Sequence, residues 1–306
     1  MSFVSLTAIR SSLRAGILFV FVAPFVFLVS GTAAISSRLS GRIVFTVSAN
    51  SRGDLYTVDA TGLRRRQLTN DRPWELYPVW SPDGRSIAYV KDWLYRIPAT
   101  GGPPRLLLGK SSSARAGITG IQDLSWSPDG RHFAFTATTK FFSTLQVWTF
   151  ALGGTLKRVT QDGSDPSWSP GGKRIAYTGR TGIIMIGANG RGARRVPGTT
   201  PADSSPIWSP NGKWIAVSRA HTDRRKHQVV SIDLLSAVRR QRIRIVTGRF
   251  IFPAAWSPSG DAVLYLWKAD PLPASASQLF IVGRSGGHPR PVFGTDGAVG
   301  PASWHR

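Results

Sequence analysis

Short apolar segments recur along this chain, each placed just behind the same tight-turn signal. They are rich in aromatic and β-branched residues, which predicts β-strands. They lie at residues 87–89, 133–135, 175–177, 215–217 and 263–265. Each follows a Trp-Ser-Pro-x-Gly unit, in which proline presets the backbone and glycine completes a turn. The pattern therefore predicts, in every repeat, a strand that ends at tryptophan, a tight turn and a second strand.

The tryptophans that begin these units set the period of the repeat. They are Trp80, Trp126, Trp168, Trp208 and Trp256, with a sixth, Trp304, near the end of the sequence. Their spacings are 46, 42, 40, 48 and 48 residues, which suits the four-stranded blade of a β-propeller. A large indole can fill the space between neighbouring sheets. A sugar- or base-stacking platform is the functional alternative, but one tryptophan at the same place in every repeat favours a role in the core.

The first repeat begins at its turn. Residues 40–45 match the end of a turn and the strand after it, and residues 301–304 supply the missing tryptophan strand at the other end. We therefore predict an all-β fold over residues 41–306. It is a six-bladed β-propeller of four-stranded antiparallel blades, whose ring is closed by pairing of the C-terminal strand with the N-terminal strands. No amphipathic helical run of useful length appears after residue 40.

The repeat resembles a known family. The unit Pro-x-Trp-Ser-Pro-Asp-Gly-x-x-Ile-Ala-Tyr, followed by Leu-Tyr-x-x-Asp-x-x-Gly and x-Leu-Thr, is similar to the WD-like repeat of TolB-type β-propellers over residues 41–306. The resemblance implies a six-bladed propeller that binds another protein or assembly of the bacterial cell envelope. In TolB an additional α/β domain precedes the propeller. Here only about six residues separate the predicted export signal from the first strand, so we expect that domain to be absent.

The N-terminus is typical of an export signal. Arg10 and Arg14 form a basic region, residues 15–30 are uncharged and mostly apolar, and residues 31–34 are small. This predicts a signal peptide at residues 1–34, a short linker at 35–40, and a mature protein that begins near Ile35. The alternative is an uncleaved membrane anchor, since no charge appears from Ala15 through Ser37. Both interpretations place the domain outside the cytoplasm, in the periplasm or the extracellular space.

Composition adds two constraints. The chain has no cysteine, which excludes disulfides and cysteine-ligated metal sites. Its net charge of +23 predicts attraction to anionic partners such as nucleic acid, acidic glycan or lipid headgroups, unless the charge is only a scattered, solvated surface. Arg240, Arg242 and Arg244 alternate along the expected fourth strand of the fifth blade, so they are expected to share one face. They form a candidate anion-binding stripe, or they block edge-to-edge pairing of an exposed strand.

A second candidate site lies on the loops before the tryptophan strands. Function often resides in loops held by a rigid scaffold, and the acids there lie three or five residues before a repeat tryptophan. We expect these residues to ring the mouth of the central channel: Trp74, Glu75, Tyr77, Asp123, Asp165 and Asp203. They would form a cation site or a socket for a basic or hydroxyl-rich ligand. The alternative is a set of solvated acids that cap turns.

No catalytic motif is visible. The sequence has no acyl-transfer triad, paired-carboxylate motif, nucleotide loop or zinc motif, and the three basic residues between His221 and His227 oppose metal binding there. We expect a monomeric, non-catalytic scaffold that binds an envelope protein and needs no cofactor. One alternative is a binder of anionic polymer, and the other is a glycan lyase or hydrolase with its site at the channel mouth. Membrane contact is expected only if the N-terminal segment is retained.

Overall fold

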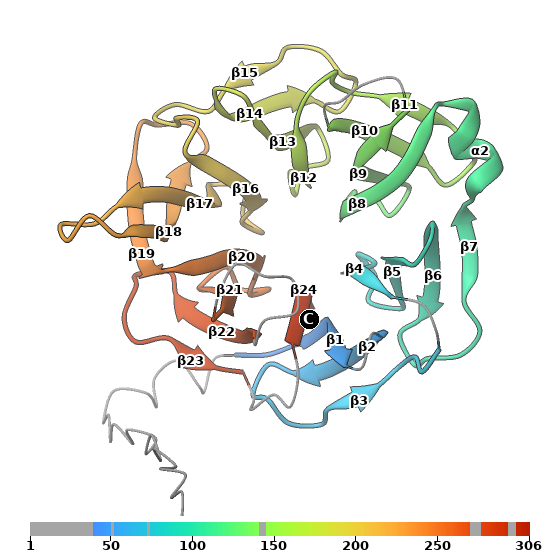
Figure 1. Cartoon of the computed structure of the whole chain (residues 1–306), viewed down its shortest axis with the longest axis horizontal. Coiled ribbons are helices and arrows are strands. Elements are labelled where there is room, and N and C mark those ends of the chain that lie inside the picture. Colours follow the sequence, from blue (N-terminus) through green and yellow to red (C-terminus); the bar gives the residue numbers. More distant parts are fainter. Residues whose placement is uncertain (1–38, 50–51, 72–73, 141–144, 270–276, 293–297) are drawn as a thin grey trace, which may run out of the picture.

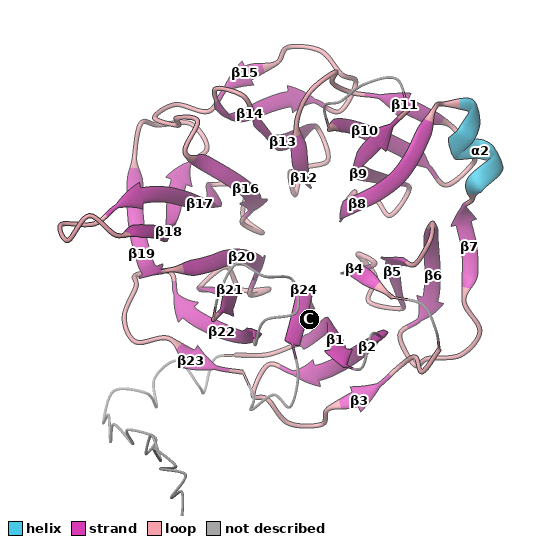
Figure 2. Cartoon of the chain, in the orientation of Figure 1, coloured by secondary structure: helices cyan, strands magenta, loops and turns pink. Residues whose placement is uncertain are grey.

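The computed structural model describes residues 39–306 except 50–51, 72–73, 141–144, 270–276 and 293–297. Within the described residues the strands form six four-stranded antiparallel sheets arranged as a ring (Figure 1). Figure 2 shows that strand and loop make up almost all of the ring. The predicted six-bladed propeller is thereby confirmed. The predicted signal peptide at residues 1–34, or membrane anchor, lies outside the described residues.

Each blade contains four strands, which follow one another from the innermost to the outermost. Blade 1 consists of β24 (Ala298–His305), β1 (Arg42–Ala49), β2 (Arg52–Asp59) and β3 (Arg66–Gln67). Blade 2 consists of β4 (Leu76–Trp80), β5 (Ser86–Val90), β6 (Leu94–Pro98) and β7 (Arg105–Leu108). Blade 3 consists of β8 (Ile118–Trp126), β9 (His132–Thr139), β10 (Gln146–Ala151) and β11 (Leu156–Arg158).

The remaining three blades have the same order in the second half of the chain. Blade 4 consists of β12 (Ser164–Trp168), β13 (Arg174–Gly179), β14 (Gly182–Gly187) and β15 (Arg194–Arg195). Blade 5 consists of β16 (Asp203–Trp208), β17 (Trp214–Thr222), β18 (Gln228–Ser236) and β19 (Arg242–Gly248). Blade 6 consists of β20 (Phe250–Trp256), β21 (Ala262–Lys268), β22 (Ser277–Gly283) and β23 (Arg290–Pro291).

Blade 1 closes the ring as the sequence predicts. Strand β24 pairs antiparallel with β1, with Arg42 opposite His305 and Ile43 opposite Trp304. The indole Nε1 of Trp304 donates to the carbonyl of Ser40 at 2.9 Å. The seam gives blade 1 its fourth strand, because without β24 the edge of β1 would leave backbone groups unpaired.

The Ser-Pro-x-Gly turns gather at one end of the ring. In blade 2 the Ser81 hydroxyl donates to the Asp83 carboxylate at 2.6 Å and accepts from the amide N–H of Ser86 at 2.9 Å. Gly84 adopts φ +69°, which glycine reaches without strain. Successive turns lie side by side, since a Cβ on Gly130, Gly172, Gly212 or Gly260 would sit 3.3–4.0 Å from the turn proline of the preceding blade.

Turns between the third and fourth strands lie at the same end of the ring. Ala188 N–H, in such a turn of blade 4, donates to the carbonyl of Lys173, directly after the Ser-Pro-x-Gly turn. Ala237 N–H makes the equivalent bond to Lys213 in blade 5, and both bonds are 3.0 Å long. We call this end of the ring, formed by both kinds of turn, the turn face. The opposite end is the mouth.

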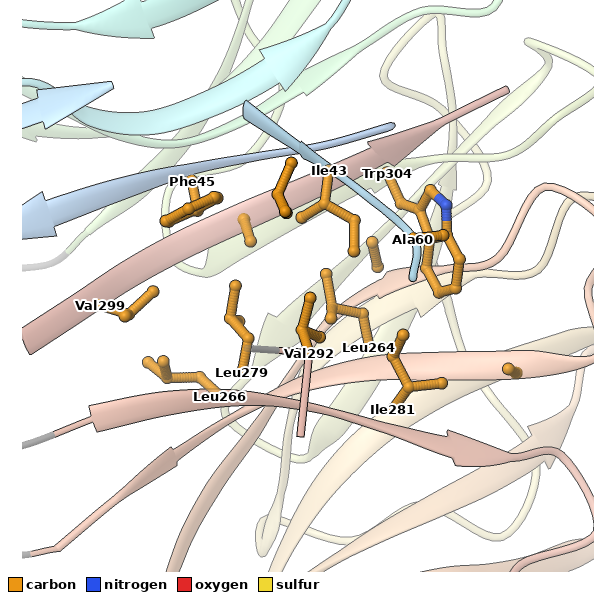
Figure 3. Close-up of a cluster of buried hydrophobic side chains, with 14 of the residues drawn as sticks. Ile43, Phe45, Ala60, Leu264, Leu266, Leu279, Ile281, Val292, Val299 and Trp304 are labelled. Atoms are coloured by element: carbon orange, nitrogen blue, oxygen red, sulfur yellow. The ribbon is translucent and has the colours of Figure 1, made fainter. Parts of the chain in front are cut away.

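The hydrophobic core lies between neighbouring blades. Figure 3 shows the cluster at the seam, where Ile43 and Phe45 of β1 pack with Leu264 and Leu279 of blade 6 and with Trp304 of β24. The repeat tryptophans all lie on inner strands, and apart from half-buried Trp126 each is less than 10% exposed. Burying so much apolar surface between sheets is what makes each blade depend on its neighbours.

Two local features differ from the repeat. A six-residue helix, α2 (Lys110–Arg115), lies between β7 and β8, where the sequence indicates only a long loop. In blade 5, β17 and β18 extend as a long hairpin whose tip, residues 223–227, projects outward at the left of Figure 1. Within the described residues, no helix is both long enough and apolar enough to cross a membrane.

Candidate functional site

A cavity of about 1080 Å³ runs through the centre of the ring. Its walls are the inner strands, from the acids and aromatics near the mouth down to the turn prolines Pro82, Pro128, Pro170 and Pro210. Most of the lining is apolar or hydroxylic. Among the described lining residues the charged side chains are Asp123, Asp165 and Lys268.

A β-bulge in the inner strands shapes the upper part of the cavity. In blades 2 to 6 the inner strand shifts register by one or more residues shortly before the tryptophan. Four bulge residues adopt left-handed backbone angles of 52–54°: Tyr77, Asp123, Asp165 and Ser205. Each lies three positions before its tryptophan and lines the cavity. Left-handed φ costs a non-glycine residue about 1–2 kcal/mol, less for Asp, so these positions store backbone strain where four blades converge.

Threonines on neighbouring strands hold two of the bulges in place. Thr136 of β9 is fully buried, and its hydroxyl accepts from the amide N–H of Asp165 at 3.0 Å. Thr178 of β13 accepts from the amide N–H of Ser205 at 2.9 Å in the same way. Each bond joins one blade to the bulge of the next. The positions of Asp165 and Ser205 are thus set by the preceding blade.

Asp123 and Asp165 form an acidic pair from blades 3 and 4. The Asp165 carboxylate accepts from the hydroxyls of Ser164 at 2.7 Å and Thr178 at 2.9 Å. Burial and the negative charge of Asp165 raise the pKa of Asp123 to about 7, against the opposing effect of hydrogen bonds from Thr136 and the Asp165 backbone. The two carboxyls therefore carry fewer than two charges at neutral pH.

Aromatic side chains complete the mouth. Tyr77 is half-buried, and burial together with the charges of Asp123 and Asp165 raises its pKa to about 12, so it stays a hydroxyl donor. Trp74 is 41% exposed and Phe252 is 39% exposed, and both line the cavity. This arrangement can hold a cationic or hydroxyl-rich group among apolar surfaces.

The structure brings together Trp74, Tyr77, Asp123 and Asp165, but it separates Glu75 and Asp203 from them. Both of these acids are fully buried and neither lines the cavity. Glu75 accepts from the Thr69 hydroxyl, and Asp203 is bound by two arginines. The expectation that all four acids ring the mouth is therefore wrong for these two. They lie five positions before the tryptophan, and the intervening bulge turns that position into the blade interface.

The arginine stripe is not a free anion-binding surface. Arg242 contacts Asp203 and Asp233 at 2.8 Å each, and Arg244 contacts Asp233 at 3.3 Å. Burial opposes the charge of Arg242, but its two carboxylate partners raise its pKa. Arg240 lies in the turn before β19 and is exposed. Because Arg242 binds Asp203, the stripe and the expected mouth acids do not occupy separate surfaces.

The hairpin that carries His221 and His227 is closed by a local bond network. The Asp223 carboxylate accepts from the amide N–H groups of Arg225 and His227 at 2.8 and 2.9 Å. Among the described residues, no group of three or more His, Asp or Glu side chains is arranged to hold a metal ion.

Sequence reasoning missed several residues of the cavity. Ser205, Phe252 and Lys268 line it, and the supporting threonines Thr136 and Thr178 lie on β9 and β13, not on the loops before the tryptophan strands. One signal could have found Ser205. It occupies the same position, three before tryptophan, as Tyr77, Asp123 and Asp165.

Similarity to known proteins is clearer in fold than in sequence. No family model matches the chain. The Tol-Pal system protein TolB of Alcanivorax borkumensis is 35% identical over 88 residues, which span 27% of this chain and 19% of that protein. The match therefore spans about a fifth of the length of this curated relative.

Solved structures show the likeness over most of the ring. TolB from Acinetobacter baumannii aligns with a TM-score of 0.68 at 21% identity, covering 86% of this chain and 66% of the other. A structure assigned as TolB from Agrobacterium tumefaciens aligns at 0.65 and 20% identity, covering 88% and 99%. An oligogalacturonate lyase from Vibrio parahaemolyticus aligns at 0.56 and 11% identity, covering 82% and 74%. In fold, the chain is a TolB-like six-bladed β-propeller.

Proposed function

We propose that this chain is an exported, non-catalytic scaffold of the bacterial cell envelope that binds a protein partner at the mouth of its channel. The TolB-like fold supports the role, since the similar proteins include a component named for the Tol-Pal system. The basic and then apolar sequence at the N-terminus supports export. Because fold alone is a weak guide to function, the residues of the mouth carry more weight.

The observation that carries the proposal is the contrast between the mouth and the rest of the protein. The chain has a net charge of +23, yet the acidic pair Asp123 and Asp165 lines a cavity whose lining also includes the exposed rings of Trp74 and Phe252. A cavity that combines exposed aromatics with charged groups is typical of surfaces that anchor a partner. A partner that inserts a lysine, an arginine or an amino terminus would find both a countercharge and apolar contact there.

The acidic pair makes binding depend on pH. The pKa of Asp123 is about 7 in the free protein, so Asp123 takes up a proton as the pH falls through neutrality. A cationic group of the partner then loses part of its countercharge. We expect affinity for the partner to weaken between pH 8 and pH 6, and the single variant D123N, which keeps Asp165, to lack that dependence.

The test is capture of partners from an envelope extract. Immobilised protein should retain a defined envelope protein, and D123N/D165N should lose it, whereas the matched variant D261N should not. Asp261 is exposed and follows the last Ser-Pro-x-Gly turn, so this control removes one charge from the opposite end. Salt should change mainly the association rate.

One outcome would contradict the proposal. If the same partner were still retained by D123N/D165N and by a Trp74→Ser variant, but released by moderate salt, the contact would be a diffuse electrostatic one away from the mouth.

A further inference from the structure

Basic residues recur on the turn face, and in one sector no acid in the same turn offsets them. The residue directly after the turn glycine is basic and exposed in blades 2 to 5: Arg85, Arg131, Lys173 and Lys213. In blades 2 and 3 an aspartate in the same turn, Asp83 or Asp129, offsets that charge. In blades 4 and 5 the equivalent turn position is Gly171 or Asn211, so the charge is not offset.

Blades 4 and 5 therefore present an uncompensated basic patch. Residues 166–202 contain six arginines and lysines and no acid. The patch combines three of these residues with three from blade 5, all with exposed side chains: Lys173, Arg174 and Arg191, and Lys213, Arg239 and Arg240. The bonds from Ala188 and Ala237 to the carbonyls of Lys173 and Lys213 bring the two kinds of turn together. Within the described part of the chain, no carboxylate forms an ion pair with these six.

Exposed aliphatic side chains lie at turn tips on the same face. Val238 is 76% exposed and sits next to Arg239 in the turn between β18 and β19. Leu63 is 67% exposed and sits next to Arg64 in the equivalent turn of blade 1. Leu152, in the equivalent turn of blade 3, is 40% exposed. Aliphatic tips flanked by cations are the composition of surfaces that rest in the headgroup region of a bilayer.

The path of the chain points to the same face. The carbonyl of Ser40 accepts from the Trp304 indole, and the carbonyl of Gly41 accepts from Ala60 N–H, in the turn that carries Leu63. The chain thus enters the ring at the turn face. In the uncleaved form of the protein, the sequence from Ala15 through Ser37, which has no charged residue, precedes this entry point.

We propose that the turn face docks on the surface of an anionic phospholipid membrane. The basic patch of blades 4 and 5 attracts the headgroups, and the tips Val238 and Leu63 enter the interfacial layer. The mouth then faces away from the membrane. A hydrated polyanion, such as nucleic acid or acidic glycan, would be attracted by the charges alone and would gain nothing from the aliphatic tips, so the tips favour lipid.

The lack of cysteine in the chain permits a site-specific test with the full-length protein. A Val238→Cys variant and a Leu145→Cys variant are each labelled with an environment-sensitive fluorophore. Leu145 is a matched control, because it is 37% exposed and lies on the mouth side, before β10. The proteins are mixed with vesicles of phosphatidylglycerol and phosphatidylcholine, or of phosphatidylcholine alone.

We expect the label at position 238 to shift to the blue on anionic vesicles only, and to revert at high salt, while the label at 145 stays unchanged. Replacing Arg239 and Arg240 by serine should weaken the response by roughly five-fold for each charge removed. The control R224S/R249S removes two charges at the mouth side and should have little effect. Arg224 and Arg249 are exposed and lie in the β17–β18 hairpin and in the turn between β19 and β20.

Three results would overturn the proposal. The first is a label at position 238 that does not respond to anionic vesicles. The second is an equal response at positions 238 and 145, or an equal loss in R224S/R249S. The third is a response to soluble heparin or DNA with none to vesicles, which would identify the patch as a polyanion site. None of these results bears on partner capture at the mouth, so the two proposals fail separately.

Discussion

Glu75 is a carboxylic acid held away from water. Its side chain is fully buried, and one oxygen accepts from Thr69. The buried hydroxyl of Tyr89 lies beside the carboxyl and interacts with it, and the pKa of Tyr89 is raised by burial and by the charges of Glu75 and Asp71. Burial, with the charges of Asp71 and Asp54, raises the pKa of Glu75 from 4.5 to about 7, although Thr69 and Lys91 favour the charged form.

This carboxyl should make stability fall as the pH rises. Between pH 4.5 and about 7 the folded protein binds a proton at Glu75 that the unfolded chain has already lost. The free energy of unfolding should therefore decrease across that interval, by on the order of 3 kcal/mol, and level off above it. A Glu75→Gln variant should lose this contribution and show a smaller total decrease, because Asp123, whose pKa is also raised to about 7, keeps its own contribution. Denaturant unfolding at several pH values measures both, with D261N as the control, and parallel curves for wild type and Glu75→Gln would contradict the assignment.

Single positions also show where sequence reasoning stops. Asp123 and Asp165 were predictable as mouth residues, because they precede a strand whose place in the ring the repeat defines. Glu75 and Asp203 are also acids, and they too lie an odd number of residues before tryptophan, so a regular strand would place them on the same face as Asp123 and Asp165. The bulge adds one residue to the strand and breaks this alternation of faces. The bulge depends on left-handed backbone angles at Tyr77 and Ser205. These angles cannot be predicted from the type of side chain at the two positions.

In blades 1, 3 and 6 the outer strand is short, and a long basic side chain on it binds to the next blade. Strand β3 and strand β23 have only two residues each. Arg66 of β3 donates to the carbonyl of Thr100 in blade 2, and Arg290 of β23 donates to that of Ala60 in blade 1, each at 2.8 Å. Lys157 of β11 reaches the carbonyl of Asn189 in blade 4 at 2.7 Å. Part of the positive charge therefore joins blades and is not free for a ligand.

Removing one of these bridging side chains should weaken the ring. Arg290 is half-buried, and its replacement by alanine leaves the Ala60 carbonyl without that donor. We expect a loss of about 1–3 kcal/mol in the free energy of unfolding, because the bond involves a charged donor. Arg284→Ala is the matched control, since Arg284 is exposed and lies in the turn before β23. Equal melting temperatures for the two variants would show that the bond contributes nothing.

Elements were predicted with unequal success. The second and third strands of each blade follow from their apolar runs, and the turns follow from Ser-Pro-x-Gly. Helix α2 has a polar sequence, Lys-Ser-Ser-Ser-Ala-Arg, without periodicity or a side-chain cap, so nothing in it signals a helix. The arginines of β19 alternate as expected, but their pairing with Asp203 and Asp233 depends on contacts between strands far apart in sequence.

The whole ring depends on the seam at blade 1. Trp304 is buried in the cluster of Figure 3, and the Ser303 hydroxyl accepts from the amide N–H of Trp80 at 3.3 Å, so β24 also contacts blade 2. His305 fills the place next to Gly84 that a turn proline occupies in blades 3 to 6. The sequence predicted the whole architecture because the partial repeat at residues 41–67 lacks the tryptophan strand that residues 301–304 supply, so the two together form one complete blade.

Loss of the seam should destabilise the entire protein. Trp304→Ala removes a buried indole and its bond to Ser40, and large aromatic-to-alanine changes cost about 3–5 kcal/mol. Deleting residues 301–306 should cost more, because it also exposes the edge of β1. Calorimetry should show both variants melting far below wild type, with deletion of exposed Arg306 alone as the control. An unchanged melting temperature for the truncated protein would show that β24 does not close the ring.

Strand β24 also sets the order in which the protein can mature. Among the strands of the ring, β1 is synthesised first and β24 last, yet they must lie side by side. All strands of blades 2 to 6 are synthesised before β24, whereas blade 1 lacks its inner strand until β24 is made. Ring closure is therefore a late step that joins the two most distant strands of the chain, which is intrinsically slow. A growing chain can therefore complete the native ring only after the eight residues of β24 have been synthesised.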